Sequence, residues 1–451
     1  MNITELKALL REGGVVGAGG AGFPSYAKLD ERADTLILNC AECEPLLKLH
    51  QQLLEQHAEE ILRAFDLIAK TIGATSVILG IKKHYKQTIE AVEQHMSAYP
   101  NMSICRLPAV YPAGDEVVLI YEATGRVVPA GGLPIAVGVT VFNVETILNV
   151  ANLLNGHPVT HKYVTIAGEV ARPATFKVPI GTAIRELIEL AGGTTTSHPA
   201  YMMGGPMMGR IGSVHEPVTR TTNAVLVLPD DHLLIEKKQA KPFVDMKRAM
   251  AACCQCNYCT DLCPRHMLGH PIEPHKFMLY ASNGITNDAT PYLNSFFCVS
   301  CGLCELYSCG QGLAPRTLLA ACKNGLRQNG VKPPVPEVKP VNPARENRRV
   351  PMNRLMARLR LTAYDKPAPL SDAKTSENEL RILLSQHIGA PAKAVVAVGD
   401  KVTVGQVIAA AAENALSVNI HAPISGTVKS VSDSVITLKG DTPHSNLPQS
   451  G

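Results

Sequence analysis

Eight cysteines fall into two runs whose spacing suits iron–sulfur ligation. The first run has separations of two, two and three residues and ends in Cys-Pro, and the second has separations of two, two and four. Three thiolates at this spacing can wrap one cubane cluster, and where two clusters occur the fourth cysteine of each run ligates the other cluster. We therefore predict two 4Fe-4S clusters. Cys253, Cys256, Cys259 and Cys309 would hold the first, and Cys298, Cys301, Cys304 and Cys263 the second.

Two other uses of cysteine compete with this interpretation. Structural zinc also binds CxxC pairs, but zinc sites rarely repeat three cysteines at successive spacings of two. The 13 cysteines could instead form disulfides, although nine lie between Cys253 and Cys309 in a chain that does not open on a signal peptide. Cys254 could replace Cys253 as a ligand. Because such clusters each carry one electron, we expect electron transfer. Since the clusters are sensitive to oxygen, we also expect a reducing compartment.

Composition excludes several classes of protein. With 451 residues and 46% hydrophobic content the chain can form several cores, and its length suggests about three domains. A net charge of +4, no Trp and 4% aromatic residues argue against a nucleic-acid partner. The longest apolar stretch, Ala394–Ala412, is interrupted by Asp400 and Lys401. We therefore predict no transmembrane segment.

A glycine-rich segment near the N-terminus could bind an anion. Gly17-x-Gly19-x-x-Gly22 matches the dinucleotide fingerprint, and Glu42 and Glu44 follow at a suitable distance. A helical pattern over residues 3–11 precedes the glycines, however, whereas a Rossmann loop must follow a strand. Glycines still let backbone N–H groups approach a phosphate, and Lys28 could add charge. The alternative is a purely structural glycine turn.

The order of elements predicts several modules. Strands at 35–39, 76–81 and 138–142 alternate with helices such as 144–154, which predicts an α/β layer. Two strands and a helix at 184–191 then suggest a β-grasp module.

The second half of the chain continues with a linker and a β-rich unit. The segment 331–376 is rich in proline and carries six arginines from Arg345 to Arg360, which predicts a solvated or docked linker helix, with a partner or lipid surface as the alternative. The last residues resemble the barrel-sandwich hybrid of lipoyl carriers. The segment Glu413–Asn419 lacks the attachment lysine, so we expect a structural or docking module.

Four blocks in the first 150 residues give a specific resemblance: Gly17–Pro24 with Ser25 and Lys28, Asn39–Pro45, Tyr111–Glu116 and Phe142–Thr146. They resemble the FMN site of the NADH-binding subunit of respiratory complex I and of the C subunit of Rnf electron-transport complexes. The resemblance implies that FMN contacts Gly17, Gly19, Gly20, Lys28, Asn39, Glu42, Gly114, Glu116 and Asn143. It also implies that Phe23, Glu44 and Glu116 face the nicotinamide of NADH.

The resemblance also gives a fold class and domain boundaries. The expected chain is multidomain α/β plus α+β: a Rossmann-like FMN/NADH domain (1–155), a soluble-ligand-binding β-grasp domain (156–240), a helical ferredoxin-like domain with two 4Fe-4S clusters (241–330), the linker (331–376) and an all-β barrel-sandwich hybrid (377–451). Rnf C subunits carry the hybrid barrel before the flavin domain, whereas here it comes last. This order resembles the cobalamin reductases of propanediol-utilisation microcompartments.

That family implies an NADH-dependent oxidoreductase that passes electrons through FMN and both clusters to cobalamin. Hydride transfer requires no side-chain base, so no catalytic residue is named. The implied partners are a corrinoid adenosyltransferase and microcompartment shell proteins, inside a microcompartment of the bacterial cytoplasm. Two alternatives are an Rnf-type subunit that exchanges electrons between NADH and ferredoxin or a membrane partner, and an electron wire without flavin.

Overall fold

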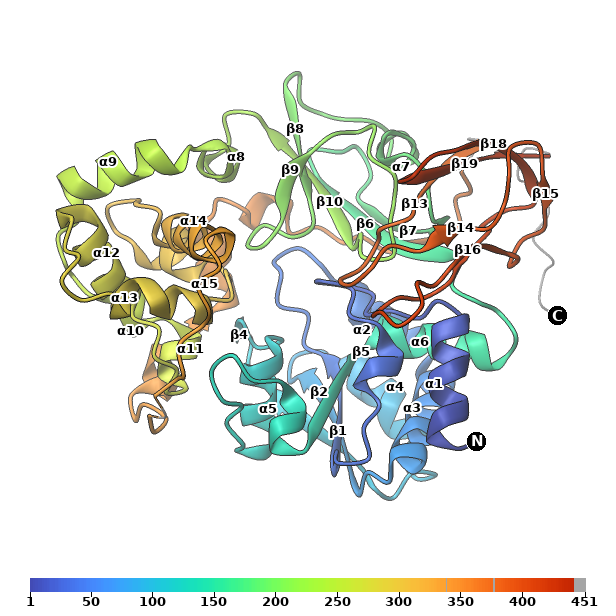
Figure 1. Cartoon of the computed structure of the whole chain (residues 1–451), viewed down its shortest axis with the longest axis horizontal. Coiled ribbons are helices and arrows are strands. Elements are labelled where there is room, and N and C mark those ends of the chain that lie inside the picture. Colours follow the sequence, from blue (N-terminus) through green and yellow to red (C-terminus); the bar gives the residue numbers. More distant parts are fainter. Residues whose placement is uncertain (338, 376–377, 442–451) are drawn as a thin grey trace.

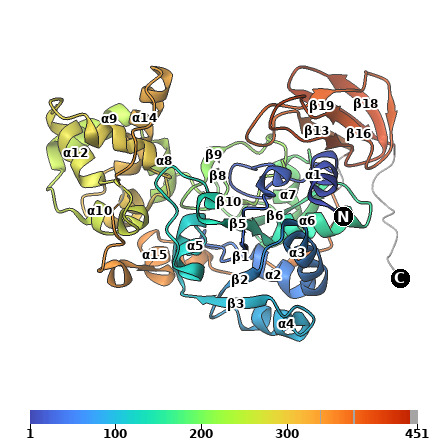
Figure 2. The same ribbon diagram turned by 60° about the horizontal axis from the view of Figure 1, so that its bottom comes forward.

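The computed structural model describes residues 1–337, 339–375 and 378–441. The chain forms an elongated molecule with a helical module at one end and a β barrel at the other, and two sheet-containing modules lie between them (Figures 1 and 2). Parts of two predicted segments, residues 338 and 376 of the linker and residues 377 and 442–451 of the last unit, lie outside the described residues. Within the described part of the chain, no helix has the length and apolar character needed to cross a membrane.

The N-terminal module is built on a parallel sheet with the strand order β3-β2-β1-β5. Because helices cover both faces of such a sheet, its strands are almost continuously apolar. Leu36 and Leu38 of β1 pack on one face, and Ile37 packs on the other. The strands are β1 (Thr35–Cys40), β2 (Ser76–Lys82), β3 (Met102–Leu107) and β5 (Val139–Asn143).

Five helices contribute to the core on one face of this sheet, and α5 packs on the opposite face. Local sequence signals set their ends. Asn2 caps α1 in a capping box with Glu5, and α3 ends at Gly73 in the left-handed conformation (φ 77°). The helices are α1 (Ile3–Glu12), α2 (Leu49–Gln56), α3 (Ala58–Ile72), α4 (Lys86–Met96), α5 (Glu116–Thr124) and α6 (Val144–Leu154).

The second module is a six-stranded mixed sheet with the order β12-β7-β6-β10-β8-β9. The two strands that come first in the chain, β6 and β7, pair antiparallel, and β10 joins β6 in parallel, as expected for a β-grasp arrangement. One face packs against α7. The elements are β6 (His161–Gly168), β7 (Ala174–Pro179), α7 (Ile184–Leu190), β8 (Pro199–Met203), β9 (Arg210–Gly212), β10 (Ala224–Pro229) and β12 (Leu370–Ser371).

Short helices carry both cysteine runs at one end of the molecule (Figure 1). Their small core includes Phe277, Phe297 and Leu319, and several cysteines pack against it. The helices are α8 (Leu233–Gln239), α9 (Pro242–Ala252), α10 (Tyr258–Asp261), α11 (Pro264–Met267), α12 (Pro274–Asn283), α13 (Thr290–Leu293) and α14 (Pro315–Gln328).

The C-terminal module is a barrel of two small antiparallel sheets around one core. One sheet has the order β13-β19-β18-β15, and the other has the order β14-β16-β17. The strands are β13 (Glu379–Leu383), β14 (Lys393–Ala394), β15 (Lys401–Val402), β16 (Val407–Ala410), β17 (Ile420–His421), β18 (Gly426–Val431) and β19 (Val435–Gly440).

The segment predicted as a linker is docked along the molecule. Its strand β11 (Val350–Pro351) pairs with β4 (Val110–Tyr111) of the N-terminal module, and β12 extends the second sheet. Between them, α15 (Met352–Arg358) buries Leu355 completely. These contacts agree with the docked form of the predicted linker helix.

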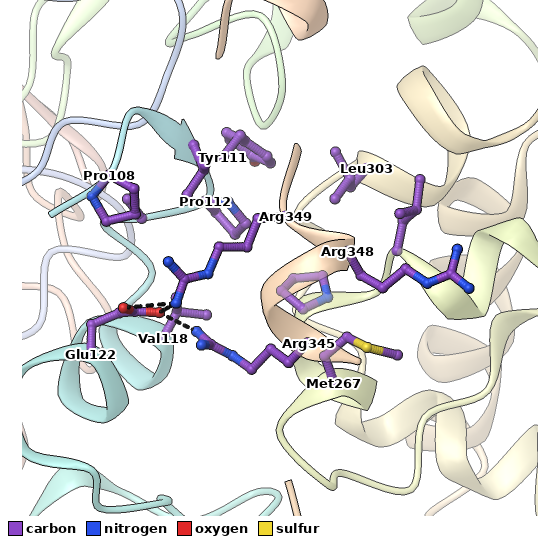
Figure 3. Close-up of a pocket in the computed structure, with 14 residues that line it drawn as sticks. Pro108, Tyr111, Pro112, Val118, Glu122, Met267, Leu303, Arg345, Arg348 and Arg349 are labelled. Carbon is purple, nitrogen blue, oxygen red and sulfur yellow. Dashed lines mark hydrogen bonds and ion pairs between the residues drawn. The ribbon is translucent and has the colours of Figure 1, made fainter. Parts of the chain in front are cut away.

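A carboxylate of α5 anchors the arginine-rich part of this segment. Arg345 and Arg349 both point at Glu122, and Arg349 Nη2 lies 2.9 Å from Glu122 Oε1, whereas Arg348 turns away (Figure 3). The Arg345 guanidinium also lies 4.6 Å from the Tyr121 ring centroid. Two arginines of the predicted linker therefore hold it against the N-terminal module.

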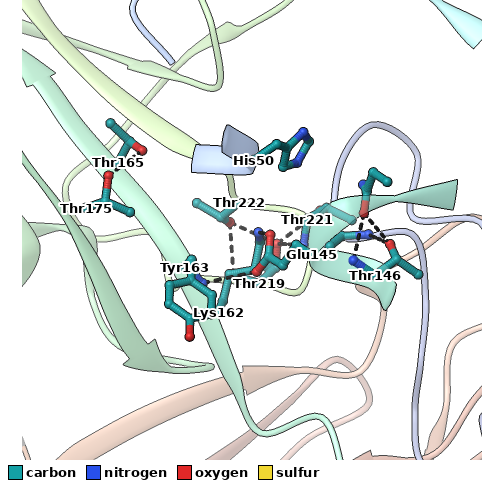
Figure 4. Close-up of polar contacts among 12 residues, drawn as sticks. His50, Glu145, Thr146, Lys162, Tyr163, Thr165, Thr175, Thr219, Thr221 and Thr222 are labelled. Atoms are coloured by element: carbon teal, nitrogen blue, oxygen red, sulfur yellow. Dashed lines mark hydrogen bonds and ion pairs between the residues drawn. The ribbon is translucent and has the colours of Figure 1, made fainter. Parts of the chain in front are cut away.

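One buried ion pair joins the N-terminal module to the β-grasp module. Lys162 of β6 pairs with Glu145 of α6, and both side chains are 1% exposed (Figure 4). The second Glu145 oxygen accepts a hydrogen bond from the Tyr163 backbone N–H at 3.2 Å. Burial lowers the pKa of Lys162, and Glu145 opposes that shift. Each charge therefore compensates the other in a site away from water.

We expect Lys162→Met to lower the free energy of unfolding by about 3–5 kcal/mol, because it leaves an uncompensated carboxylate in the interior. Urea unfolding followed by circular dichroism measures the loss. Lys162→Met/Glu145→Leu should recover most of it, since removing both charges is far less costly. Lys429→Met, which breaks the exposed pair with Glu379, should change stability by less than about 1 kcal/mol. Equal losses in the two single variants would contradict the assignment.

Candidate functional site

The carboxyl ends of β1 and β5, with the segments that surround them, form the region that we call the flavin-type crevice. The strand order reverses between these neighbours, and ligands of open α/β sheets bind at such switch points. Asn39, one residue before the end of β1, and Asn143, the last residue of β5, are partners in the sheet register. Asn39 Nδ2 donates to the Gly114 carbonyl oxygen at 2.9 Å. Asn143 Oδ1 accepts from Thr146 N at 2.8 Å and so caps α6.

The glycine loop Gly17–Gly22 is tied to the start of α6. The Ala18 N–H donates to Thr146 Oγ1 at 3.0 Å, and Gly17 N–H donates to the Phe23 carbonyl oxygen at 2.9 Å. Gly20 has a φ of 63°, a conformation that suits glycine. Helix α1 precedes the loop, as the sequence predicts, so the loop is not a Rossmann turn. It nevertheless reaches the same crevice through its contact with α6.

Lys28 and Glu116 lie on the neighbouring wall. Lys28 Nζ is 3.2 Å from Glu116 Oε1 and donates to the Val141 carbonyl oxygen at 2.9 Å. A Cβ on Gly114 would lie 2.2 Å from the Ala41 carbonyl oxygen, so this block requires glycine. The cation, the carboxylate and the close backbone approach therefore come from separate sequence blocks that the fold brings together.

The two predicted acidic residues bind backbone groups of the protein. Glu42 Oε2 accepts from the His50 N–H at 3.1 Å, within the first turn of α2. Glu44 accepts from the N–H groups of Met207 and Met208 at 2.8 and 2.9 Å. Burial raises the pKa of Glu44, against these two hydrogen bonds. Glu44 thus joins the flavin-type blocks to a loop of the β-grasp module.

The turn Thr219–Asn223 of the β-grasp module packs against the glycine loop. No motif in the sequence indicates this contact. The Thr219 N–H donates to the Thr222 hydroxyl oxygen, and a second hydrogen bond joins the two hydroxyls (Figure 4). A Cβ on Gly19 would lie 2.5 Å from Asn223 Nδ2, and one on Gly22 would lie 2.7 Å from Thr221 Cγ2. Asn223 Oδ1 is buried without a hydrogen-bond partner among the described residues.

The crevice therefore has polar groups suited to a flavin phosphate ester. Glycines let backbone N–H groups approach an anion, and Lys28 supplies a cation. The Asn223 oxygen, which has no partner among the described residues, is an acceptor that suits a hydroxyl or N–H donor of a ligand. Eight of the nine predicted FMN residues lie in the glycine loop or in contacts beside it: Asn39 bonds to Gly114, Lys28 pairs with Glu116, and a Cβ on Gly19 would lie 3.7 Å from Asn143 Nδ2. The ninth, Glu42, is turned toward α2.

The eight predicted cluster ligands divide between two cavities. Cysteines of both runs line each cavity, and the two linings match the crossed sets expected from the spacing. The first cavity, of about 220 Å³, is lined by Cys253, Cys256, Cys259 and Cys309, with Cys254 beside them. The second is lined by Cys263, Cys298, Cys301 and Cys304. Among the described residues, no three His, Cys, Asp or Glu side chains converge as ligands of a metal ion do.

The thiols of each cavity also influence one another. Burial, followed by repulsion from Cys309, Cys256 and Cys253, raises the pKa of Cys259 to about 12. Burial also raises the pKa of Cys304, and Cys298, Cys301 and Cys263 add to the rise. These two sets are the same as the predicted ligand sets. A cluster of iron ions suits them, because metal ions stabilise the thiolate form.

The second cavity adjoins the flavin-type crevice. The Tyr111 hydroxyl donates to the Cys301 carbonyl oxygen at 2.6 Å. Arg265 pairs with Asp115 at 2.9 Å, and both side chains are less than 15% exposed. Asp115 also caps α5 next to Gly114. The first cavity, by contrast, has exposed cysteines in its wall, so it reaches the surface of the molecule.

Four family models match the chain: the Nuo51 FMN-binding domain at residues 10–152, the SLBB domain at 163–211, a 4Fe-4S dicluster domain at 252–314 and the RnfC barrel sandwich hybrid domain at 363–444. The predicted fold class, with its FMN-binding, iron–sulfur and barrel-sandwich hybrid modules, is confirmed by these matches.

Similar proteins include a component of an ion-translocating complex. The chain is 32% identical over 274 residues to the C subunit of the Na⁺-translocating ferredoxin:NAD⁺ oxidoreductase complex of Acetobacterium woodii, and the match covers 59% of each chain. Among solved structures, an NAD⁺-reducing [NiFe]-hydrogenase in the H₂-reduced state aligns with 81% of this chain and 68% of that chain, at a TM-score of 0.49 and 20% identity. That likeness is too distant to bear on function.

Two relatives match almost from end to end. Cobalamin reductase PduS of Citrobacter freundii is 40% identical over 437 residues, which is 96% of each chain. Cobalamin reductase PduS of Salmonella typhimurium strain LT2 is 41% identical over 445 residues, which is 97% of each chain. With such identity along the whole chain and the same FMN-type and dicluster modules, this protein belongs to the cobalamin reductase PduS family.

Proposed function

We propose that this protein is an NADH-dependent cobalamin reductase with an FMN and two 4Fe-4S clusters between its two substrates. A bound FMN would supply the change from two-electron to one-electron chemistry, and bound clusters would supply one-electron transfer. The observation that carries the proposal is the spatial order of the crevice and the two cysteine cavities. The flavin-type crevice adjoins the second cysteine cavity through Tyr111 and Asp115, and the first cavity reaches the surface.

The residues of the crevice bind and orient, and none of them needs to act as a base. Asn39 and Asn143 pair near the carboxyl ends of β1 and β5, and the glycine loop, held by its Ala18 N–H, would bring other backbone N–H groups to the phosphate. Lys28 balances that charge beside Glu116. Phe23 and Glu116 would border the nicotinamide, and Glu44 would hold the Met207–Met208 loop over the site.

The cysteines would bind the two clusters in the crossed pairs that line the cavities. Cys263, Cys298, Cys301 and Cys304 would hold the cluster nearer the flavin, and Cys253, Cys256, Cys259 and Cys309 the cluster nearer the surface. Tyr111 and Arg265 fix the distance between the crevice and the nearer cavity. The order of electron flow follows from this placement.

The relatives named cobalamin reductase supply the identity of the acceptor. A cobalamin reduced by this protein would be consumed by a corrinoid adenosyltransferase. We infer that both act inside a propanediol-utilisation microcompartment of the bacterial cytoplasm, in contact with shell proteins. The alternative, an Rnf-type subunit that serves ferredoxin or a membrane partner, rests on relatives that match 59% of the chain.

The central experiment is anaerobic purification with iron, sulfide and flavin counts, followed by NADH-driven reduction of hydroxocobalamin. We expect about one flavin and about eight iron atoms per chain, and cobalamin reduction that depends on both. A protein that contains zinc in place of iron, or no flavin, would overturn the proposal. Fractionation with the membranes through integral subunits would favour the Rnf-type alternative.

Cys259→Ala should lower the iron content by about half, because four of the eight thiolates lose their cluster. Stopped-flow spectroscopy should still show flavin reduction by NADH, while hydroxocobalamin reduction is lost. Cys309→Ala should remove the same cluster, as judged by the same electron paramagnetic resonance signal. Cys254→Ala is the matched control and should retain both clusters. Full cobalamin reduction by Cys259→Ala would place this cluster off the path.

Gly19→Ala should weaken FMN binding about tenfold, equivalent to about 1.4 kcal/mol, because the new methyl group meets the Asn223 amide. Titration of the flavin-free protein with FMN, followed by fluorescence quenching, measures the loss. In an Asn223→Ala background, Gly19→Ala should cost less affinity than it does in the wild-type protein, since the obstructing amide is gone. Gly325→Ala, in a helix with open space around it, serves as the control. An equal loss in the two backgrounds would argue against the contact.

A further inference from the structure

Helix α9 exposes a row of large apolar side chains. Phe243 is 70% exposed and Met250 is 64% exposed. They lie on one face of the helix with Lys247 between them, and Val244 lies beside this row. The opposite face buries Ala249 in the core shared with α12 and α14. In Figure 1, α9 lies at the outer edge of the helical module, away from the sheets.

This row leads directly into the first cysteine cavity. Helix α9 ends at Ala252, and the next residues form the loop that lines that cavity. Cys254 and Cys256 of the loop are exposed, and Tyr258 beyond them is 54% exposed. An exposed apolar surface of this kind marks an interaction site more often than a single exposed residue does. Here it lies next to the point where the first cavity reaches the surface.

The same surface is positively charged. Lys241, Lys247 and Arg248 are exposed, whereas Asp245, the one acidic residue of α9, is only 4% exposed. Lys247 Nζ lies 4.4 Å from the Phe243 ring centroid, which places a cation over the apolar row. Residues 241–332 contain nine Lys and Arg and five Asp and Glu, and Glu305 among the acids is also buried.

We propose that the outer face of α9 and the adjoining loop Cys254–Tyr258 form the docking surface for an acidic protein that carries the electron acceptor. The proposal rests on the proposed function in one respect, that electrons leave through the clusters. An apolar centre with a basic rim is complementary to an acidic partner. A second copy of this chain would oppose Lys247 and Arg248 with identical cations, so a symmetric contact through this face is unfavourable.

The transfer at this surface balances as a one-electron step. NADH loses two electrons and one proton, and two oxidised carrier molecules each gain one electron in turn. No bond forms between the two proteins. Docking against the Cys254–Tyr258 loop would bring the carrier next to the surface-nearest cluster site. Electrostatic attraction would then raise the rate of encounter, and salt would weaken it.

The test uses the holoenzyme, NADH and oxidised flavodoxin, a small acidic protein that accepts single electrons. At low salt, Lys247→Glu/Arg248→Glu should lower kcat/KM for flavodoxin at least about tenfold, and the difference should shrink as salt rises. Phe243→Ser/Met250→Ser should lower it at all salt concentrations. Lys393→Glu/Lys401→Glu and Val395→Ser/Val398→Ser, exposed pairs on the barrel, are the matched controls. Iron content and stopped-flow flavin reduction should be unchanged in every variant.

Three results would overturn the proposal. The first is a rate of flavodoxin reduction by the wild-type protein that does not depend on salt. The second is an equal loss with free hydroxocobalamin, which would make the face a small-molecule site. The third is a wild-type dimer in sedimentation analysis that the α9 variants dissociate. If the wild-type protein reduced flavodoxin as expected but never reduced cobalamin, the docking surface would stand and the proposed substrate would fall.

Discussion

The part-buried pair between Arg265 and Asp115 fixes the geometry on which electron transfer in this molecule depends. Arg265 follows Cys263 by two residues, and Asp115 lies between Gly114 and Glu116 in the flavin-type blocks. A charge-assisted hydrogen bond in a site sheltered from water is stronger and more rigid than one at the surface. The Tyr111 hydroxyl adds a second bond to the Cys301 carbonyl oxygen. Together they hold a cysteine of each run at a constant distance from the crevice.

A second constraint acts on the glycine loop, which three modules surround. Asn223 and Thr221 press on it from the β-grasp module. His387 of the barrel approaches Gly22, and the Ile388 N–H donates to the Ala21 carbonyl oxygen at 2.9 Å. Gly19 and Gly22 are therefore required by the packing of the protein itself. Rigid walls of this kind reduce the ordering cost of binding a cofactor.

Local patterns predicted much of the fold. Helix α6 spans residues 144–154 as expected, since an asparagine cap and apolar spacing define it within one stretch of sequence. The crossed cysteine sets were also predictable, because the ligand spacing of cubane clusters is a property of the loop itself. The sequence reveals only the residue types of the FMN-type blocks. That Glu42 turns to His50 and Glu44 to Met207 depends on contacts between distant segments.

The features that could not be predicted from the sequence are contacts between modules. The Thr219–Asn223 turn has ordinary turn composition, and only the folded chain shows that it meets Gly19. The same holds for residues 331–375, which look like a linker because proline and arginine are frequent in linkers. Their short strands β11 and β12 pair with β4 and β7, far away in sequence. The exact domain boundaries and the role of each ligand residue stay predictions.

The barrel module lies beside the first residues of the chain. Asn419 N–H donates to the Arg11 carbonyl oxygen at 3.2 Å, Arg11 Nη2 donates to the Ala412 carbonyl oxygen at 2.9 Å, and the Tyr26 hydroxyl donates to the Ala415 carbonyl oxygen at 3.4 Å. A barrel in this place could be encoded before α1 or after α15 and occupy the same position. Circular permutation of the gene could therefore interconvert the module order of Rnf C subunits and the order in this protein without rebuilding the crevice.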